Sequence, residues 1–224
     1  HRDEIMQCVE RVFVSGKFVG GEEVDLFEKE VADYCGVSHA VALNSGTDAL
    51  MLGMSVLGIG PGDEVITPPN SFIASTAAIA RLGATPIFAD VRDDMNIDPD
   101  KFAAAISPRT KAVMPVHLTG RIADMDPILE IAQKNNLIVV EDASQAFGSL
   151  YKEKIAGSFG HMGCFSAHPL KNLNAAGDAG FLLTDDAEVA EKMASLRNHG
   201  IVGKGRSEIF GVVSRMDTIQ AALL

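Results

Sequence analysis

One lysine stands where covalent chemistry is favoured. Lys171 lies in the segment 165–173, FSAHPLKNL, is the only lysine between Lys154 and Lys192, and has apolar or small neighbours. A lysine in a tight and largely buried loop is unfavourable unless a charged partner or covalent chemistry keeps it there. Desolvation favours the neutral amine, which is a nucleophile toward aldehydes. The competing interpretation is a lysine whose long side chain reaches out to water.

A Ser/Gly/Thr turn that follows an apolar run could bind a phosphate. The segment 44–50, NSGTDAL, follows the apolar residues 40–43 and precedes a helical pattern. Free backbone N–H groups and the positive end of the helix dipole would attract an anion there. Gly46 would let the backbone come close to that anion. Taken alone, the segment is better explained as an ordinary helix start capped by Ser45.

Two carboxylates end the apolar run 137–140. Glu141 and Asp142 precede Ala143, Ser144 and Gln145. We expect one carboxylate to face the solvent rim of a sheet and the other to point into a ligand crevice. A partly buried carboxylate there needs a cationic partner, for which a protonated heteroaromatic nitrogen, a metal ion or an arginine would serve. A loop carboxylate that caps residues 143–147 explains the pattern equally well.

These signals, together with one aromatic residue, converge on one ligand. Phe72 follows the apolar run 64–67 and supplies a ring that could stack on a flat molecule, although most phenylalanines belong to the core. A phosphate cradle, a carboxylate, a reactive lysine and an aromatic ring match four groups of pyridoxal 5'-phosphate. These are its phosphate, its basic ring nitrogen, its aldehyde and its flat face. The sequence therefore predicts a pyridoxal-phosphate site.

The elements that must position these residues follow from the apolar periodicity. Helical patterns cover residues 4–14, 22–34, 47–57, 72–82, 124–135, 188–198 and 216–224. Short segments that are mainly apolar cover residues 40–44, 64–68, 85–90, 111–117, 137–142, 163–166 and 180–184. Such runs, without alternation, predict strands covered on both faces. The fold class is therefore α/β, a mostly parallel central sheet with helices on both faces, in a single domain.

In a sheet of this kind the ligand binds beyond the carboxyl ends of the strands. The strand ends in this sequence are followed by polar or catalytic residue types. They are residues 44–47, 68–72, His117, 142–145 and 166–171. We therefore expect all of them at one rim of the sheet, around one ligand.

Composition excludes several classes of protein. With 224 residues, 47% of them hydrophobic, and a net charge of −11, the chain is a globular protein and not a sequence-independent nucleic-acid binder. No apolar run approaches the roughly 18 residues of a membrane span. Cys8, Cys35 and Cys164 form no C-x-x-C pair, so we expect small buried hydrophobes, no metal site and a cytoplasmic location. The first ten residues contain no apolar signal core.

The sequence resembles the DegT-type nucleotide-sugar aminotransferases, a group of fold-type-I pyridoxal-phosphate enzymes. The blocks that carry the resemblance follow one another along practically the whole chain. They are VSGKFVGGEEVDLFEKEVADYCGV (14–37), NSGTDAL (44–50), GIGPGDEVITP (58–68), PVHLTGRIADMDPI (115–128), VEDASQAFGS (140–149), FSAHPLKNL (165–173) and SRMDTIQAALL (214–224). The fold implied is the large domain of the aspartate-aminotransferase type.

The resemblance implies a role for each candidate site residue. Lys171 would bond covalently to pyridoxal phosphate and carry the proton during transamination, Asp142 would pair with the pyridinium nitrogen, and Gln145 would hydrogen-bond the phenolic oxygen. The residues implied in cofactor binding are Gly46, Thr47 and Ser166 at the phosphate, Phe72 on the ring face, and Asp142, Gln145 and Lys171. His117, His168 and Asn172 match motif positions, where packing and ligand contact are equally expected.

The resemblance also implies an activity and partners. Enzymes of this group transfer an amino group from an amino acid, usually glutamate, to a nucleotide-linked keto-sugar in polysaccharide or antibiotic-sugar biosynthesis. They work as cytoplasmic homodimers with a shared active site, without nucleic acid or membrane. A sugar dehydratase on the same scaffold would carry histidine in place of Lys171, which argues against that alternative. A non-catalytic or regulatory protein that keeps the fold is the other alternative.

Two features depart from the family pattern. Val213 stands where family members usually carry an asparagine that reaches the phosphate of the neighbouring subunit's cofactor, and Ala179 stands where the family often has glycine. The family's smaller C-terminal domain is absent, and the helical pattern stops at Leu224. We therefore expect residues 1–224 to be the pyridoxal-phosphate-binding large domain, and the chain to be a fragment of a longer enzyme.

Overall fold

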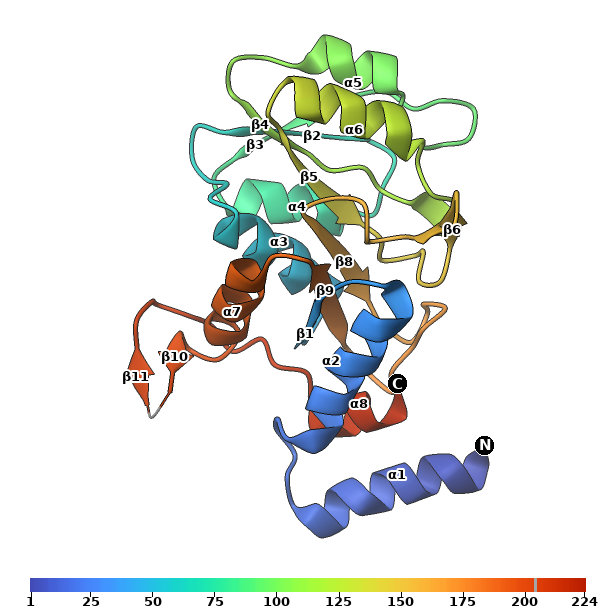
Figure 1. Cartoon of the computed structure of the whole chain (residues 1–224), viewed down its shortest axis with the longest axis vertical. Coiled ribbons are helices and arrows are strands. Elements are labelled where there is room, and N and C mark those ends of the chain that lie inside the picture. Colours follow the sequence, from blue (N-terminus) through green and yellow to red (C-terminus); the bar gives the residue numbers. More distant parts are fainter. Residues whose placement is uncertain (204) are drawn as a thin grey trace.

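A twisted seven-stranded sheet forms the centre of the computed structural model, which describes residues 1–203 and 205–224 (Figure 1). The strands run in the order β1-β9-β8-β5-β4-β2-β3. They are β1 (His39–Leu43), β2 (Glu64–Thr67), β3 (Thr85–Phe88), β4 (Thr110–Val113), β5 (Ile138–Asp142), β8 (Met162–Ser166) and β9 (Gly180–Thr184). Strand β9 is antiparallel to β1 and β8, and every other neighbouring pair is parallel. The predicted mostly parallel sheet is confirmed.

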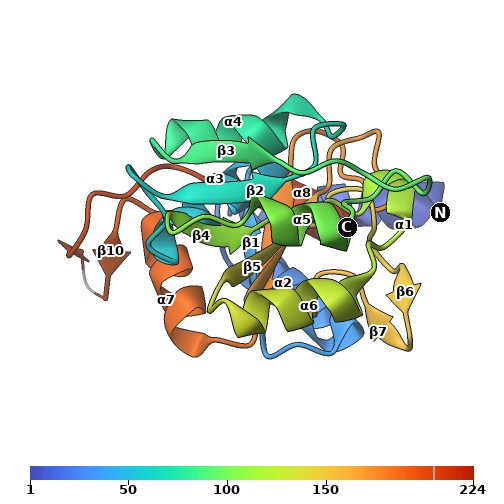
Figure 2. The same cartoon turned by 90° about the horizontal axis from the view of Figure 1, so that it is seen from above.

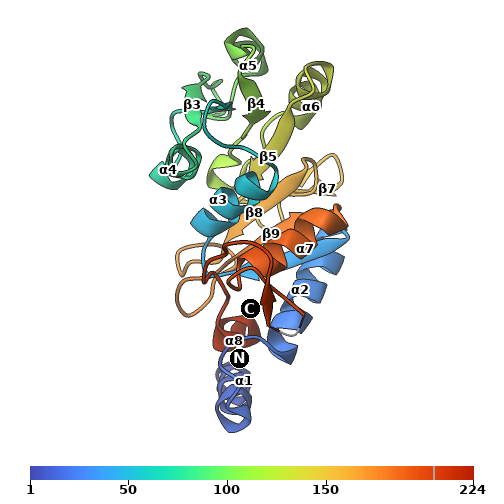
Figure 3. The ribbon, with the colours of Figure 1, turned by 90° about the vertical axis from the view of Figure 1, so that its left-hand side faces the viewer.

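Helices cover both faces of this sheet, as predicted. One face carries α3 (Gly46–Val56), α4 (Ile73–Arg81) and α7 (Ala187–Leu196). The other carries α2 (Glu22–Cys35), α5 (Pro99–Ala105), α6 (Met125–Lys134) and α8 (Thr218–Leu223). Seen along the sheet, α3 and α4 lie on one side, and α2 and α6 on the other (Figure 3).

Alternate residues of each strand supply the two halves of the core. On β5, Val140 packs with α3 and α4, whereas Val139 packs with α6. On β9, Leu182 faces α3, and Phe181 stacks on Phe165 with ring centroids 4.7 Å apart on the α2 side. Because successive side chains of a strand point to opposite faces, strands covered on both sides must be apolar at every position. This is why the runs in the sequence show no alternation.

The structure adds elements that the periodicity does not reveal. Helix α5 has only seven residues and no pattern of its own. It begins at Pro99 and is capped by Asp98, whose side chain accepts a hydrogen bond from Asp100 N. Two hairpins of two-residue strands are also new: β6 (Leu150–Tyr151) with β7 (Lys154–Ile155), and β10 (Ile201–Val202) with β11 (Arg206–Ser207). The second hairpin stands off the molecule beside α7 (Figure 2).

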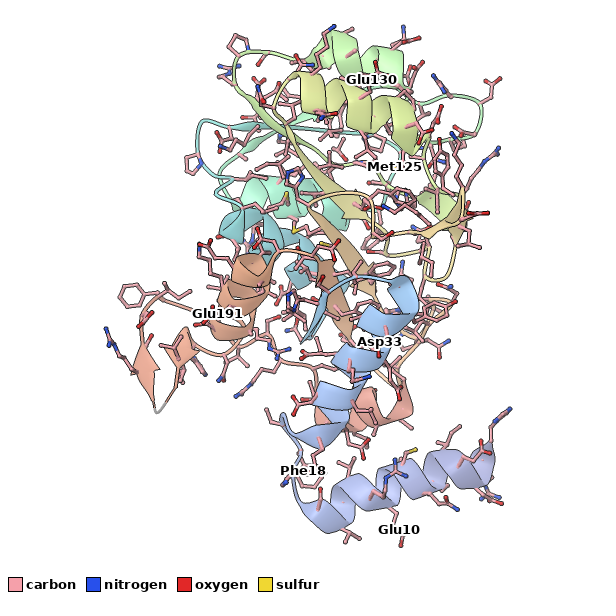
Figure 4. All side chains as sticks on the ribbon, in the orientation of Figure 1. Glu10, Phe18, Asp33, Met125, Glu130 and Glu191 are labelled. Atoms are coloured by element: carbon pink, nitrogen blue, oxygen red, sulfur yellow. The ribbon has the colours of Figure 1, made fainter. Side chains whose placement is uncertain are left out.

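Helix α1 (Arg2–Ser15) lies away from the sheet and packs against α8 (Figure 1). The turn that leads from it to α2 carries Phe18, which makes an edge-to-face contact with Phe13 (Figure 4). Only Val12 of α1 is buried. The helix therefore contributes little to the core of the described chain.

The cysteines are free thiols in two environments. Cys35 and Cys164 are buried, and burial raises the pKa of Cys35 to about 11. Burial, and then the nearby carboxylates of Asp142 and Glu141, raise the pKa of Cys164 well above its ordinary value. These two thiols are the predicted buried hydrophobes. Cys8 is different: it is half-buried, because α1 packs outside the core.

The outer surface is acidic. Glu130 on α6 and Glu191 on α7 point away from the sheet (Figure 4). Among the described residues, no helix combines the length and the apolar character that a membrane crossing requires.

Candidate active site

A cavity of about 410 Å³ opens at the carboxyl ends of the parallel strands. That volume suits a small-molecule ligand. All seven residues that the sequence indicates for cofactor binding line it: Gly46, Thr47, Phe72, Asp142, Gln145, Ser166 and Lys171. They come from α3, α4, β5, β8 and the loops that follow the last two strands. Each of the predicted strand-end segments except His117 therefore contributes to the cavity, but not with every residue: Asn44, residues 68–71, Ala143, Ala167 and Pro169 do not line it.

The floor of the cavity is the N-terminus of α3, where three backbone segments meet. Ser45 caps the helix by accepting a hydrogen bond from Asp48 N at 3.2 Å, and Gly46 is the first helical residue. A Cβ on Gly46 would lie 2.8 Å from Ser166 Cβ, and one on Gly180 would lie 2.3 Å from the carbonyl carbon of Ser45. Glycine at both positions lets β8 and β9 approach the turn, so that Gly46 and Thr47, whose N–H groups have no partner within the helix, line the cavity.

Replacing Gly46 by alanine is expected to weaken phosphate binding about tenfold and to destabilise the fold by roughly 1–3 kcal/mol, because the new methyl group must push Ser166 away. Isothermal titration with pyridoxal phosphate and thermal unfolding measure the two effects. Gly60→Ala is the matched control, since its nearest atom, Leu82 O, is 4.0 Å away. Equal behaviour of the two variants would contradict the role given to Gly46.

Asp142 places a buried negative charge in the wall of the cavity. Its side chain is 5% exposed; Oδ2 accepts a hydrogen bond from Ser75 Oγ at 2.6 Å, and Oδ1 accepts one from Ser144 N at 3.2 Å. Within the described part of the chain it forms no ion pair with lysine, arginine or histidine. A buried carboxylate without a cationic partner is costly, so this geometry calls for a cationic ligand.

Ser75 is a site residue that sequence reasoning missed. It is 1% exposed and lines the cavity on the first turn of α4. The strand-end rule pointed to residues 68–72, one helical turn earlier. The only signal in the sequence is a serine three residues after Phe72, at a helix start where serine is common.

The expectation for Glu141 is wrong, because this carboxylate does not face the solvent rim. It is completely buried on the opposite face of β5, where its oxygens accept hydrogen bonds from Gly157 N, Phe159 N, Gly160 N and His117 Nε2 at 2.7–2.9 Å. His117 Nδ1 in turn accepts from Ala123 N at 3.2 Å. His117 therefore packs within the fold, and Glu141 anchors the loop before β8.

Gln145 is held in one orientation. Its Oε1 accepts a hydrogen bond from Thr119 N at 2.8 Å, which leaves Nε2 to donate into the cavity. Thr119 has a φ of 56°, an unfavourable value for a β-branched residue. Such strain is found where a surrounding structure requires it, commonly at functional sites.

Lys171 lines the cavity, but its loop is not largely buried as the sequence suggested. The side chain is half-buried, and the preceding residues His168, Pro169 and Leu170 are exposed. The reason is that this loop forms an outer wall of the cavity and is not covered by another described element. His168 also lines the cavity, and its Nδ1 accepts a hydrogen bond from Leu170 N.

Phe72 is not a core residue. It is 69% exposed at the start of α4 and lines the cavity, so its ring is available to a ligand.

Val213, which stands where the family usually has asparagine, lines a neighbouring groove of about 440 Å³ together with Asn44, Ser45 and Arg215. Ser45 belongs to both hollows.

Comparison with known proteins gives consistent matches. The profile of the DegT/DnrJ/EryC1/StrS aminotransferase family matches residues 1–224. UDP-N-acetyl-3-dehydro-alpha-D-glucosamine 3-aminotransferase of Acidithiobacillus ferrooxidans is 47% identical over 224 residues, which are 100% of this chain and 61% of that protein.

Two solved structures are also similar. DesV of S. venezuelae, in complex with a ketimine intermediate, has a TM-score of 0.96 and 45% identity, over 99% of this chain and 60% of DesV. NtdA of Bacillus subtilis, with bound cofactor PMP, has a TM-score of 0.93 and 39% identity, over 99% of this chain and 51% of NtdA.

The chain thus spans between half and about three fifths of the length of these relatives. The match runs through all the strands and loops that line the cavity, and its fold is that of the aminotransferases to which it is similar. The chain belongs to the DegT/DnrJ/EryC1/StrS aminotransferase family.

Proposed function

We propose that the protein binds pyridoxal 5'-phosphate and transfers an amino group from an amino acid, with glutamate as the expected donor, to a keto-sugar linked to a nucleoside diphosphate. One observation carries the proposal: the buried carboxylate of Asp142, which has no cationic partner among residues 1–203 and 205–224, and the amine of Lys171 line the same cavity as the α3 N-terminus. These groups fit the ring nitrogen, the aldehyde and the phosphate of one molecule. The names of the family relatives support the same reaction class.

The residues present would hold the cofactor from several sides. The N–H groups at Gly46 and Thr47, with the hydroxyl groups of Thr47 and Ser166, would bind the phosphate. Phe72 would cover one face of the ring. Asp142 would keep the ring nitrogen protonated, and Gln145 Nε2 would donate to the phenolic oxygen.

When bound, the protonated ring withdraws electrons and acidifies the α-carbon of the amino donor. Asp142 would maintain that property through its negative charge, and its side chain is held in place by Ser75 Oγ and Ser144 N. Lys171 Nζ would accept the proton that leaves the α-carbon of the amino donor and would donate it to the carbon that carried the aldehyde, so that the amino group stays on the cofactor.

The half-reaction with glutamate tests the proposal. Protein loaded with pyridoxal phosphate is expected to lose its visible absorbance on addition of glutamate and to release a stoichiometric amount of 2-oxoglutarate. Aspartate and alanine, added separately, test which donor is preferred. A protein that binds the cofactor but produces no keto acid with any of them would contradict the aminotransferase function and favour a binding-only role.

We also propose that two chains assemble around this site in the cytoplasm, and that residues 1–224 form the cofactor-binding large domain. Large apolar side chains are exposed around the cavity and the neighbouring groove: Phe72, the adjacent Ile73, Leu170 and Val213. A second copy would cover them. The free thiols suit a reducing compartment. Sedimentation equilibrium decides the assembly, since a monomer at micromolar concentration would contradict it.

A further inference from the structure

The loop that carries Lys171 has a closed base and an open tip. Ala167 N donates to Ala179 O and Ala175 N donates to Ala167 O, each at 2.8 Å, so both ends of the loop meet beside β8 and β9. Near the tip, Lys171 N donates to His168 O, and Asn174 Nδ2 donates to Lys171 O at 3.0 Å. These last two bonds stiffen the loop without attaching it to another part of the protein.

Near its end the loop is attached to α8, where Ala176 N donates to Gln220 Oε1 at 2.8 Å. Beside Lys171 the attachment is made by Asn172. Its Nδ2 donates to Phe147 O at 2.6 Å, across 25 positions of the sequence. Phe147 is itself fixed: its ring stacks on Tyr34 at 5.2 Å between centroids and meets Phe165 and Phe181 edge to face. It also lies two residues after Gln145, in the loop that follows β5. The Asn172 bond therefore ties the residue beside Lys171 to the segment that carries Gln145.

We propose that Asn172 is a positioning residue, which sets the distance between Lys171 and Gln145 across the cavity. The inference rests on the proposed function, because the aldehyde and the phenolic oxygen of pyridoxal phosphate are on adjacent ring carbons. The amine of Lys171 and Nε2 of Gln145 must then reach neighbouring atoms at the same time. Misplacement by even an ångström lowers the rate of a bond-forming step by orders of magnitude.

Three variants separate this role from general stiffening of the loop. Asn172→Ala removes the bond to Phe147 O, and Asn172→Asp keeps the shape but replaces the donor by an acceptor. Asn174→Ala is the matched control: it removes an exposed asparagine of the same loop whose bond stays within the loop. Because both asparagines are exposed, we expect all three variants to fold, with melting temperatures within a few degrees of the unchanged protein.

The first readout needs no cofactor. Amide hydrogen exchange of residues 145–149 and 168–175 is expected to accelerate together, about tenfold, in Asn172→Ala and Asn172→Asp. In Asn174→Ala the acceleration should be confined to residues 168–175. The second readout is the rate at which borohydride fixes pyridoxal phosphate to Lys171, measured by mass spectrometry. It should fall about tenfold in both Asn172 variants and less than threefold in Asn174→Ala.

Two outcomes overturn the inference: unchanged exchange of residues 145–149 in the Asn172 variants, or equal trapping rates in Asn172→Ala and Asn174→Ala. Failure of the proposed function is recognised separately, because the unchanged protein would then fix no cofactor, or would fix it and form no keto acid from an amino donor. In that case hydrogen exchange still tests the coupling between the two loops. Joint acceleration in the Asn172 variants supports the coupling, and exchange that stays unchanged in residues 145–149 refutes it.

Discussion

Lys171→Ala is expected to abolish the fixation of pyridoxal phosphate by borohydride and to lower the rate of keto-acid formation by at least about 10³-fold. The variant loses both the nucleophile that bonds to the aldehyde and the base that moves the proton, and general acid–base catalysis by one group alone contributes roughly 10²–10⁴-fold. The fold should be unaffected, because the side chain is half-buried and forms no ion pair among the described residues. Peptide mapping after borohydride reduction measures the first effect, and single-turnover kinetics with glutamate the second.

Two controls make this result specific. Lys192→Ala removes an exposed lysine that pairs with Glu188 on α7, away from the cavity, and should leave labelling and rate unchanged. Lys171→Arg keeps the positive charge but offers no amine that condenses with an aldehyde, so it should behave as Lys171→Ala does. Labelling that persists in Lys171→Ala would show that another residue is the nucleophile.

Asp142→Asn is expected to weaken cofactor binding by at least about 10²-fold and to slow amino transfer by a similar further factor. The amide has the same shape and can still accept from Ser75 Oγ, but it carries no charge to hold the ring nitrogen protonated. Loss of one partner of a buried charge pair typically costs about 3–5 kcal/mol. Titration with pyridoxal phosphate gives the affinity, and the glutamate half-reaction at saturating cofactor gives the rate.

Ser75→Ala provides the comparison. It leaves the charge of Asp142 in place and removes one of its hydrogen-bond donors, so a loss of about tenfold or less is expected. An Asp142→Asn variant that binds the cofactor as tightly as Ser75→Ala would exclude the pairing of Asp142 with the ring nitrogen.

Much of the site could be predicted because it depends on local order along the chain. Strand β5 is apolar up to Val140 and then acidic, and the turn before α3 carries the Ser-Gly-Thr sequence; both features are visible without the fold. The carboxyl ends of parallel strands meet at one rim, so sequence position translates directly into spatial position there. That is why seven residues spread over 126 positions, from Gly46 to Lys171, line one cavity.

Other features depend on contacts between segments distant in the sequence. Glu141 and Asp142 are adjacent and chemically alike, yet the pleat of β5 sends one to the α6 side, against His117, and the other to Ser75 and the cavity. Whether Lys171 was buried depended on which elements cover its loop, and the burial expected from its apolar neighbours was wrong.

The sequence by itself determined the fold class, the strand ends and the chemical types gathered at the rim, because periodicity and residue type are local properties. Only the tertiary structure decided which of two carboxylates faces the cavity, that Ser75 and Thr119 fix Asp142 and Gln145, and that Asn172 joins the lysine loop to Phe147 O. The contacts of Ser75, Thr119 and Asn172 are hydrogen bonds between residues 25 to 67 positions apart. Such a bond exists only after the chain has packed, because no local pattern encodes its partner.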